Sequence, residues 1–88
     1  MKTKDFYVVE HYPYHSEVKS ETTIVKAYAK KHTAEVEFSE DYLECLRAND
    51  TTTKCPVYGD EVLDMYSYET FSGTKVYVRL RRIPVIMD

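Results

Sequence analysis

The sequence predicts an α+β domain in which helices cover one face of a small antiparallel or mixed sheet. Three observations support this class. Some segments alternate apolar and polar residues, others space apolar residues as a helix does, and loops are marked by Pro and Gly. The expected order of elements is β-α-β-α-β-β. Residues 1–88 are expected to form one domain, because no repeat, low-complexity tract or linker divides them.

The first strand is expected over residues 6–12, which are rich in aromatic and β-branched side chains and end at Pro13. Residues 20–31 fit two patterns. Thr22 and the β-branched residues after it favour a strand, whereas the apolar positions from Ile24 to Tyr28 fit a helical stripe, with Ser20 as N-cap. We interpret this segment as a helix.

The next segment, residues 33–38, alternates apolar and polar side chains, which predicts a strand. Its buried face is expected to consist of Ala34, Val36 and Phe38. A short helix then follows, with Ser39 as its N-cap and acidic residues in its first turn. The buried stripe of that helix is expected to be Tyr42, Leu43 and Leu46.

Two further strands are expected over residues 63–71 and 74–83, and their loop decides the register. A two-residue loop would place Glu69 beside Val76, where an unpaired charge is costly. A three-residue loop, with Gly73 at positive φ, instead sets Glu69 opposite Lys75 and Tyr68 opposite Val76. We therefore predict the three-residue loop. The apolar tail after Pro84 is expected to fold back or to meet a partner.

Charge is distributed unevenly along the chain. The formal net charge is −3, yet residues 1–34 carry +2, residues 35–70 carry −8 and residues 71–88 carry +3. The negative total makes direct nucleic-acid binding an unfavoured function, and the acidic middle predicts a protein partner with a basic surface.

No pattern in the chain predicts catalysis. Only two glycines are present, so phosphate-binding loops are excluded, and no nucleophile motif is found. Three histidines and two cysteines lack the spacing of a metal site. These five residues are His11, His15, His32, Cys45 and Cys55. We expect no enzyme activity, no cofactor, no metal and no disulfide. With neither a signal peptide nor a membrane span expected, the predicted location is cytoplasmic.

The leading functional hypothesis is a small interaction or inhibitor protein that binds its partner through an acidic, tyrosine-containing face. The acidic residues expected to make this contact are Glu35, Glu37, Glu40, Asp41, Glu44, Asp60, Glu61 and Asp64. If contiguous, they could imitate a phosphate backbone. The alternative is a single-stranded nucleic-acid-binding module that uses Tyr77, Arg79 and Arg81.

Two other features bear on this function. Nine tyrosines in 88 residues favour an interface role, and a homodimer is a further option for the partner. The small, acidic, tyrosine-rich and motif-free chain resembles accessory proteins of bacteriophages, and that resemblance implies binding to and disabling a host protein.

Overall fold

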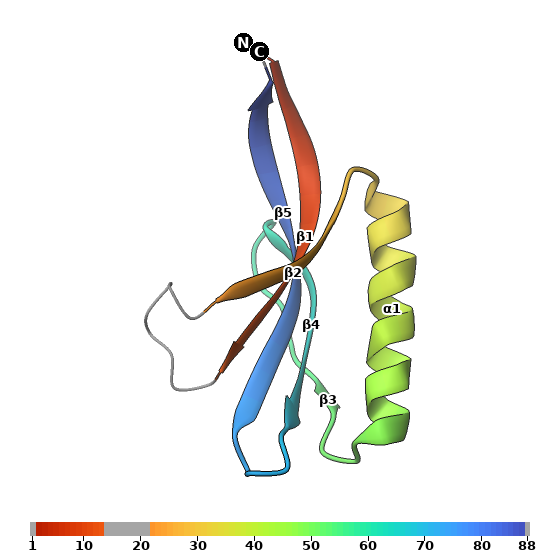
Figure 1. Ribbon diagram of the computed structural model, residues 1–88. Coiled ribbons are helices and arrows are strands. Elements are labelled where there is room, and N and C mark those ends of the chain that lie inside the picture. Colours follow the sequence, from red (N-terminus) through yellow and green to blue (C-terminus); the bar gives the residue numbers. More distant parts are fainter. Residues whose placement is uncertain (1, 14–21, 88) are drawn as a thin grey trace.

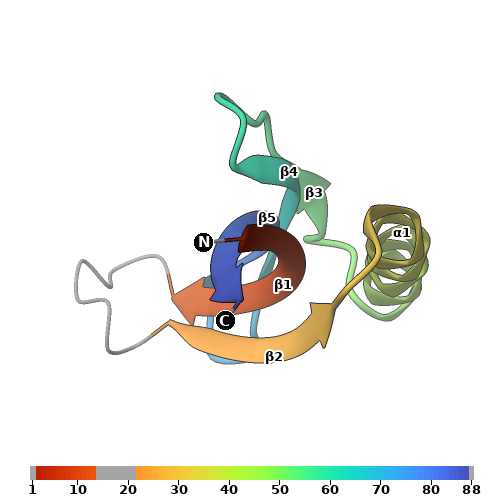
Figure 2. The same cartoon turned by 90° about the horizontal axis from the view of Figure 1, so that it is seen from above.

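The computed structural model describes residues 2–13 and 22–87 (Figure 1). Five strands form one antiparallel sheet in the order β2-β1-β5-β4-β3. A single helix, α1 (Lys31–Ala48), lies along one side of this sheet (Figure 2). The strands are β1 (Lys2–Pro13), β2 (Thr23–Tyr28), β3 (Thr53–Lys54), β4 (Val62–Glu69) and β5 (Lys75–Met87).

The predicted order β-α-β-α-β-β is wrong, because the described residues contain one helix and follow the order β-β-α-β-β-β. The first predicted helix covered residues 20–31, of which 20 and 21 lie outside the described residues. Thr23–Tyr28 form strand β2 instead, and Lys31 is the first residue of α1. The β-branched residues Thr23, Ile24 and Val25 pack well in extended chain. Pairing with β1 over Tyr7 to His11 satisfies the backbone groups of this segment. Strand propensity and pairing with β1 thus determine the structure of this segment, although its apolar residues also fit a helical spacing.

The predicted strand at 33–38 and the short helix after it are also wrong, since α1 covers both. Ala34 and Phe38 are fully buried, but they are four residues apart and so share a helix face as readily as a strand face. Val36, which a strand would bury with them, is 43% exposed. Ser39 lies inside the helix, and Lys30 is the N-cap residue without a side-chain cap.

The predicted register of the β4–β5 hairpin is confirmed. Glu69 lies opposite Lys75 and Tyr68 lies opposite Val76. Gly73 has a φ of 86°, in the left-handed region that favours glycine, and its N–H donates to the carbonyl of Thr70 at 2.9 Å. The loop chemistry in the sequence was therefore sufficient to set which face of each strand is buried.

The chain after Pro84 continues β5 and pairs with the start of β1, from Lys2 opposite Met87 to Phe6 opposite Ile83. We call residues 2–6 and 83–87 the arm, which projects from the sheet (Figure 1). β4 pairs with β5 only as far as Arg81. Pro84 therefore lies where β5 has one neighbouring strand, a position that a sheet tolerates for a residue without an N–H.

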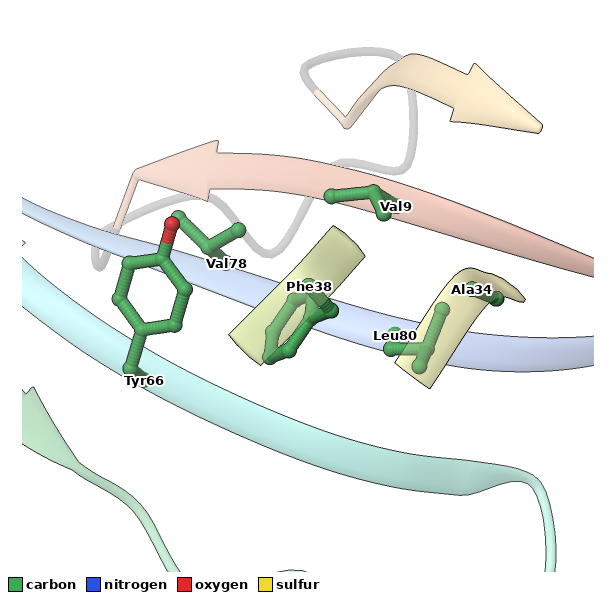
Figure 3. Packing of buried hydrophobic residues seen from close by; sticks show 6 residues of the cluster. All are labelled: Val9, Ala34, Phe38, Tyr66, Val78 and Leu80. Carbon is green, nitrogen blue, oxygen red and sulfur yellow. The ribbon is translucent and has the colours of Figure 1, made fainter. Parts of the chain in front are cut away.

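The core lies between α1 and the sheet (Figure 3). The Phe38 ring lies 5.3 Å from the Tyr66 ring, between centroids, which is within the range of favourable aromatic pairs. Burial raises the pKa of the Tyr66 hydroxyl far above its ordinary value. The buried apolar cluster consists of Val9, Ala34, Phe38, Tyr66, Val78 and Leu80.

Candidate functional site

Five of the eight predicted acidic contact residues lie on α1, but they do not form one group. Glu37, Glu40, Asp41 and Glu44 are spaced i, i+3, i+4 and i+7, so their side chains share one side of the helix. Glu35 precedes Glu37 by two residues, a rotation of about 200° on a helix, and lies on a different side. The structure thus groups four of these acids and separates the fifth.

Two of the predicted acids are already paired. Asp41 accepts from the Lys26 ammonium at 2.7 Å, and this ion pair links α1 to β2. Both carboxylate oxygens of Asp64 accept from Lys54, at 2.7 and 2.8 Å. The remaining carboxylates of the α1 group, Glu37, Glu40 and Glu44, have no ion-pair partner within the described part of the chain. We call these three residues the acidic row.

Asp60 and Glu61 are separate from the acidic row. They lie in the turn before β4. That turn projects from the sheet on a different side from α1 (Figure 2). The fold therefore does not bring all eight predicted acidic residues together on one surface.

An exposed apolar group on α1 was missed by the sequence analysis. Val36, Leu43 and Leu46 are 43%, 45% and 40% exposed. At 3.6 residues per turn, Val36 and Leu43 lie on the outer surface of the helix beside Glu40 of the acidic row. Leu46 continues this apolar group on the side away from the acidic row. We call Val36, Leu43 and Leu46 the apolar row. Leu43 and Leu46 were predicted to be buried, which is incorrect because the predicted short helix was aligned to the wrong face.

The three residues of the alternative site, Tyr77, Arg79 and Arg81, do lie together. They alternate along β5 with Val78 and Leu80, which are buried beneath α1. Side chains of successive strand residues point to opposite faces. Tyr77, Arg79 and Arg81 therefore occupy the face of the sheet that α1 leaves uncovered, which we call the helix-free face.

Glu10 of β1 is a buried charge on this face that the sequence analysis missed. It is 3% exposed and lies opposite Arg79. Its Oε1 accepts from Nε of Arg79 at 3.0 Å and from Nε of Arg81 at 2.7 Å, and its Oε2 accepts from Nη2 of Arg81 at 3.4 Å. Two guanidinium groups around one carboxylate compensate the cost of burying its charge. A glutamate directly after two valines of a predicted strand was the available signal.

Tyr12 extends the same face. Its ring stacks on that of Tyr77, with centroids 5.4 Å apart and planes inclined by 23°. The guanidinium carbon of Arg79 lies 4.8 Å from the Tyr12 centroid, within cation–π range. Burial raises the pKa of the Tyr12 hydroxyl, and the positive charge of Arg79 opposes that effect. Cation and aromatic side chains are thus interleaved across β1 and β5.

No metal centre emerges from the described residues. They contain no group of three or more His, Cys, Asp or Glu residues placed to hold a metal ion. Cys45 and Cys55 are free thiols, and His15 lies outside the described residues. No helix among residues 2–13 and 22–87 is long and apolar enough to cross a membrane.

The chain was compared with models of protein families, with curated proteins and with solved structures, and none of the three comparisons found a match.

Proposed function

We propose that this protein is a non-catalytic interaction protein that binds a basic surface of a partner protein through the outer face of α1. The observation that carries the proposal is the pair of adjacent rows on that face. The acidic row supplies three carboxylates without an ion-pair partner among the described residues, and the apolar row supplies exposed surface beside them.

The two rows have complementary roles in this proposal. Protein interfaces generally have an apolar centre and a polar rim. Val36 and Leu43 would bury their exposed area against the partner, which contributes about 25 cal/mol for each Å² removed from water. Glu37, Glu40 and Glu44 would steer a basic partner and set its orientation, because exposed charges contribute more to association rate than to affinity.

Occupying a basic surface in this way would also block it for other ligands, nucleic acid included. An inhibitory role therefore follows from the same contact. We place this action in the cytoplasm, which the two free thiols favour.

The test uses three forms of the immobilised protein: the wild type, a variant with Glu37→Gln, Glu40→Gln and Glu44→Gln, and a control variant with Glu35→Gln, Asp60→Asn and Glu61→Gln. Both variants lose three negative charges, but only the first loses the acidic row. Proteins captured from a cell lysate are quantified by mass spectrometry at about 50 and 200 mM salt, conditions that differ in electrostatic screening.

We expect the wild type and the control variant to capture a basic protein. The acidic-row variant should not capture it. Association of the purified partner should then slow as salt increases. A captured set that is the same for both variants contradicts binding through the acidic row. Circular dichroism establishes that all three forms are folded.

A further inference from the structure

We propose that the helix-free face of the sheet is a binding site for single-stranded nucleic acid, separate from the outer face of α1. The inference begins with charge. Even-numbered residues of β1 pair with odd-numbered residues of β5, so Lys2 and Lys4 share this face with Arg79, Arg81 and Lys75.

The acids of the chain lie mostly elsewhere. Glu10 and Glu69 are on the helix-free face by the same alternation, whereas the acidic row is on α1, at the opposite face of the sheet. The net charge of −3 for the whole chain is therefore a poor guide to this surface, on which, among the described residues, basic side chains outnumber acidic ones. A phosphate chain would meet an attractive potential here despite the acidic composition.

Glu10 holds the two arginines in place for such a ligand. Its carboxylate takes one N–H of Arg79 and two of Arg81. Each guanidinium has five N–H donors, and two guanidinium charges exceed one carboxylate charge by one. The remaining donors are thus positioned in advance, and a phosphate that binds them does not bear the full cost of ordering two long side chains.

The aromatic residues supply the second half of the site. Tyr12 and Tyr77 stack on each other, and Lys75 lies 5.5 Å from the Tyr77 centroid. At the other end of the face, Lys4 lies 5.5 Å from the ring of Phe6. Proteins bind single-stranded nucleic acid through surfaces on which cationic and aromatic side chains alternate. The phosphates contact the cations, and the unpaired bases stack on the rings and guanidinium planes.

A groove provides room beside the arginines. It has a volume of about 310 Å³ and is lined by Glu10, Thr22, Ile24, Arg79 and Arg81. Along β5, the ten residue steps from Lys75 to Val85, which lies opposite Lys4, span roughly 33 Å. This is a length for a few nucleotides, comparable to the smallest sites of about 4 nucleotides on OB-fold domains. Duplex bases cannot stack on the face, because their π surfaces are covered by neighbouring base pairs.

The experiment measures fluorescence anisotropy of a labelled single-stranded DNA of about 20 nucleotides, longer than the expected site. The same sequence as a duplex is the comparison. At about 50 mM salt the single strand should bind more tightly than the duplex. Lys4, Lys75 and the one positive charge of the arginine pair that Glu10 leaves uncompensated provide three phosphate contacts. Three contacts predict that the affinity for the single strand falls about 20-fold between about 50 and 200 mM salt.

Two variants test the residues. Lys4→Gln with Lys75→Gln changes exposed side chains and should reduce the salt dependence. Tyr12→Leu keeps an apolar side chain and should weaken binding about tenfold through loss of stacking. Tyr58→Leu, at an exposed tyrosine outside β1 and β5, is the matched control and should bind as the wild type does.

The proposal is overturned if the single strand does not bind at low salt, if the duplex binds as tightly, or if both variants bind as the wild type does. A folded state of each variant is established by circular dichroism, and the lysine variant alters no buried contact. The acidic-row variant should bind the oligonucleotide at least as tightly as the wild type. Loss of nucleic-acid binding would therefore be distinguishable from loss of the protein partner.

Discussion

Glu10 illustrates how much a single residue depends on distant parts of the chain. Its position next to Val8 and Val9 suggests an ordinary strand, and nothing nearby in sequence neutralises its charge. Both of its partners belong to β5, at sequence separations of 69 and 71 residues. A buried carboxylate is tolerated only with such compensation, so antiparallel pairing of β1 and β5 is what allows a glutamate at this position.

His11, the next residue of β1, should make stability depend on pH. Burial lowers its pKa below the ordinary value of 6.5, Asp41 acts in the opposite direction, and Lys26 lowers it further. A pKa that is lower in the folded state means that the unfolded state binds the proton more readily. Stability should therefore be highest above pH 6.5 and fall as the pH drops through the lowered folded pKa.

Thermal unfolding followed from neutral pH to about pH 5 measures this dependence. That window lies above the ordinary pKa range of most carboxyl groups. His11→Gln, which cannot take up a proton, should flatten the curve. An equally steep decline in that variant would show that other groups cause it.

At the level of elements, two errors came from the same source. Ala34 and Phe38 fit both a strand and a helix, and the alternation with Glu35 and Glu37 favoured the strand over a window of only six residues. The helix wins because residues 31–48 contain neither Gly nor Pro and continue a helical pattern of buried positions. A sequence window of six residues can fit both the strand period and the helix period. A window as long as α1 distinguishes the two periods better.

Truncation of apolar side chains on α1 tests which face is buried. Phe38→Ala should cost about 3–5 kcal/mol in the free energy of unfolding, because the ring is fully buried against Tyr66. Val36→Ala should change it by less than about 0.5 kcal/mol, as expected for an exposed helix position. Urea denaturation provides both values.

Leu43→Ala serves as the matched control, since Leu43 is exposed in the structure although its pattern predicted burial. It too should cost little. Costs for Val36 and Leu43 that approach that of Phe38 would instead support the strand and short helix that the alternation predicted.

On the scale of the whole molecule, the arm should be the least protected part of the sheet. β2 pairs with β1 only from Tyr7 to His11, and β4 pairs with β5 only up to Arg81. Within the described residues, the arm therefore consists of two strands without further neighbours, and isolated two-stranded ribbons are marginally stable. Its amides should exchange with solvent faster than those of the paired region around Val9 and Leu80.

Hydrogen exchange measured by mass spectrometry or NMR compares the two regions within one sample. Equal protection at low protein concentration would contradict an isolated ribbon. Protection of the arm that increases with protein concentration would indicate that a second copy covers it.

Residue types and their spacing were sufficient to predict the features that depend on local chemistry. The strand predicted over residues 6–12, which is the later part of β1, followed from its aromatic and β-branched residues. The β4–β5 register followed from the loop, because a tight loop with Gly73 at positive φ leaves few ways to align its two strands. The unequal distribution of charge along the chain could also be determined from the sequence. The three residues of the alternative site could be placed on one strand face from the sequence. Tyr77, Arg79 and Arg81 occupy every second position of β5.

Which face each element presents, and what lies opposite it, depends on contacts between segments that are distant in the chain. The sequence could not show that β2 is a strand paired with β1, that Glu10 joins Arg79 and Arg81, or that Tyr12 stacks on Tyr77. Nor could it separate Asp60 and Glu61 from the acidic row. Each of these relations joins residues distant in the chain. Local propensities amount to fractions of a kcal/mol per residue, so burial and strand pairing between distant segments overrule them.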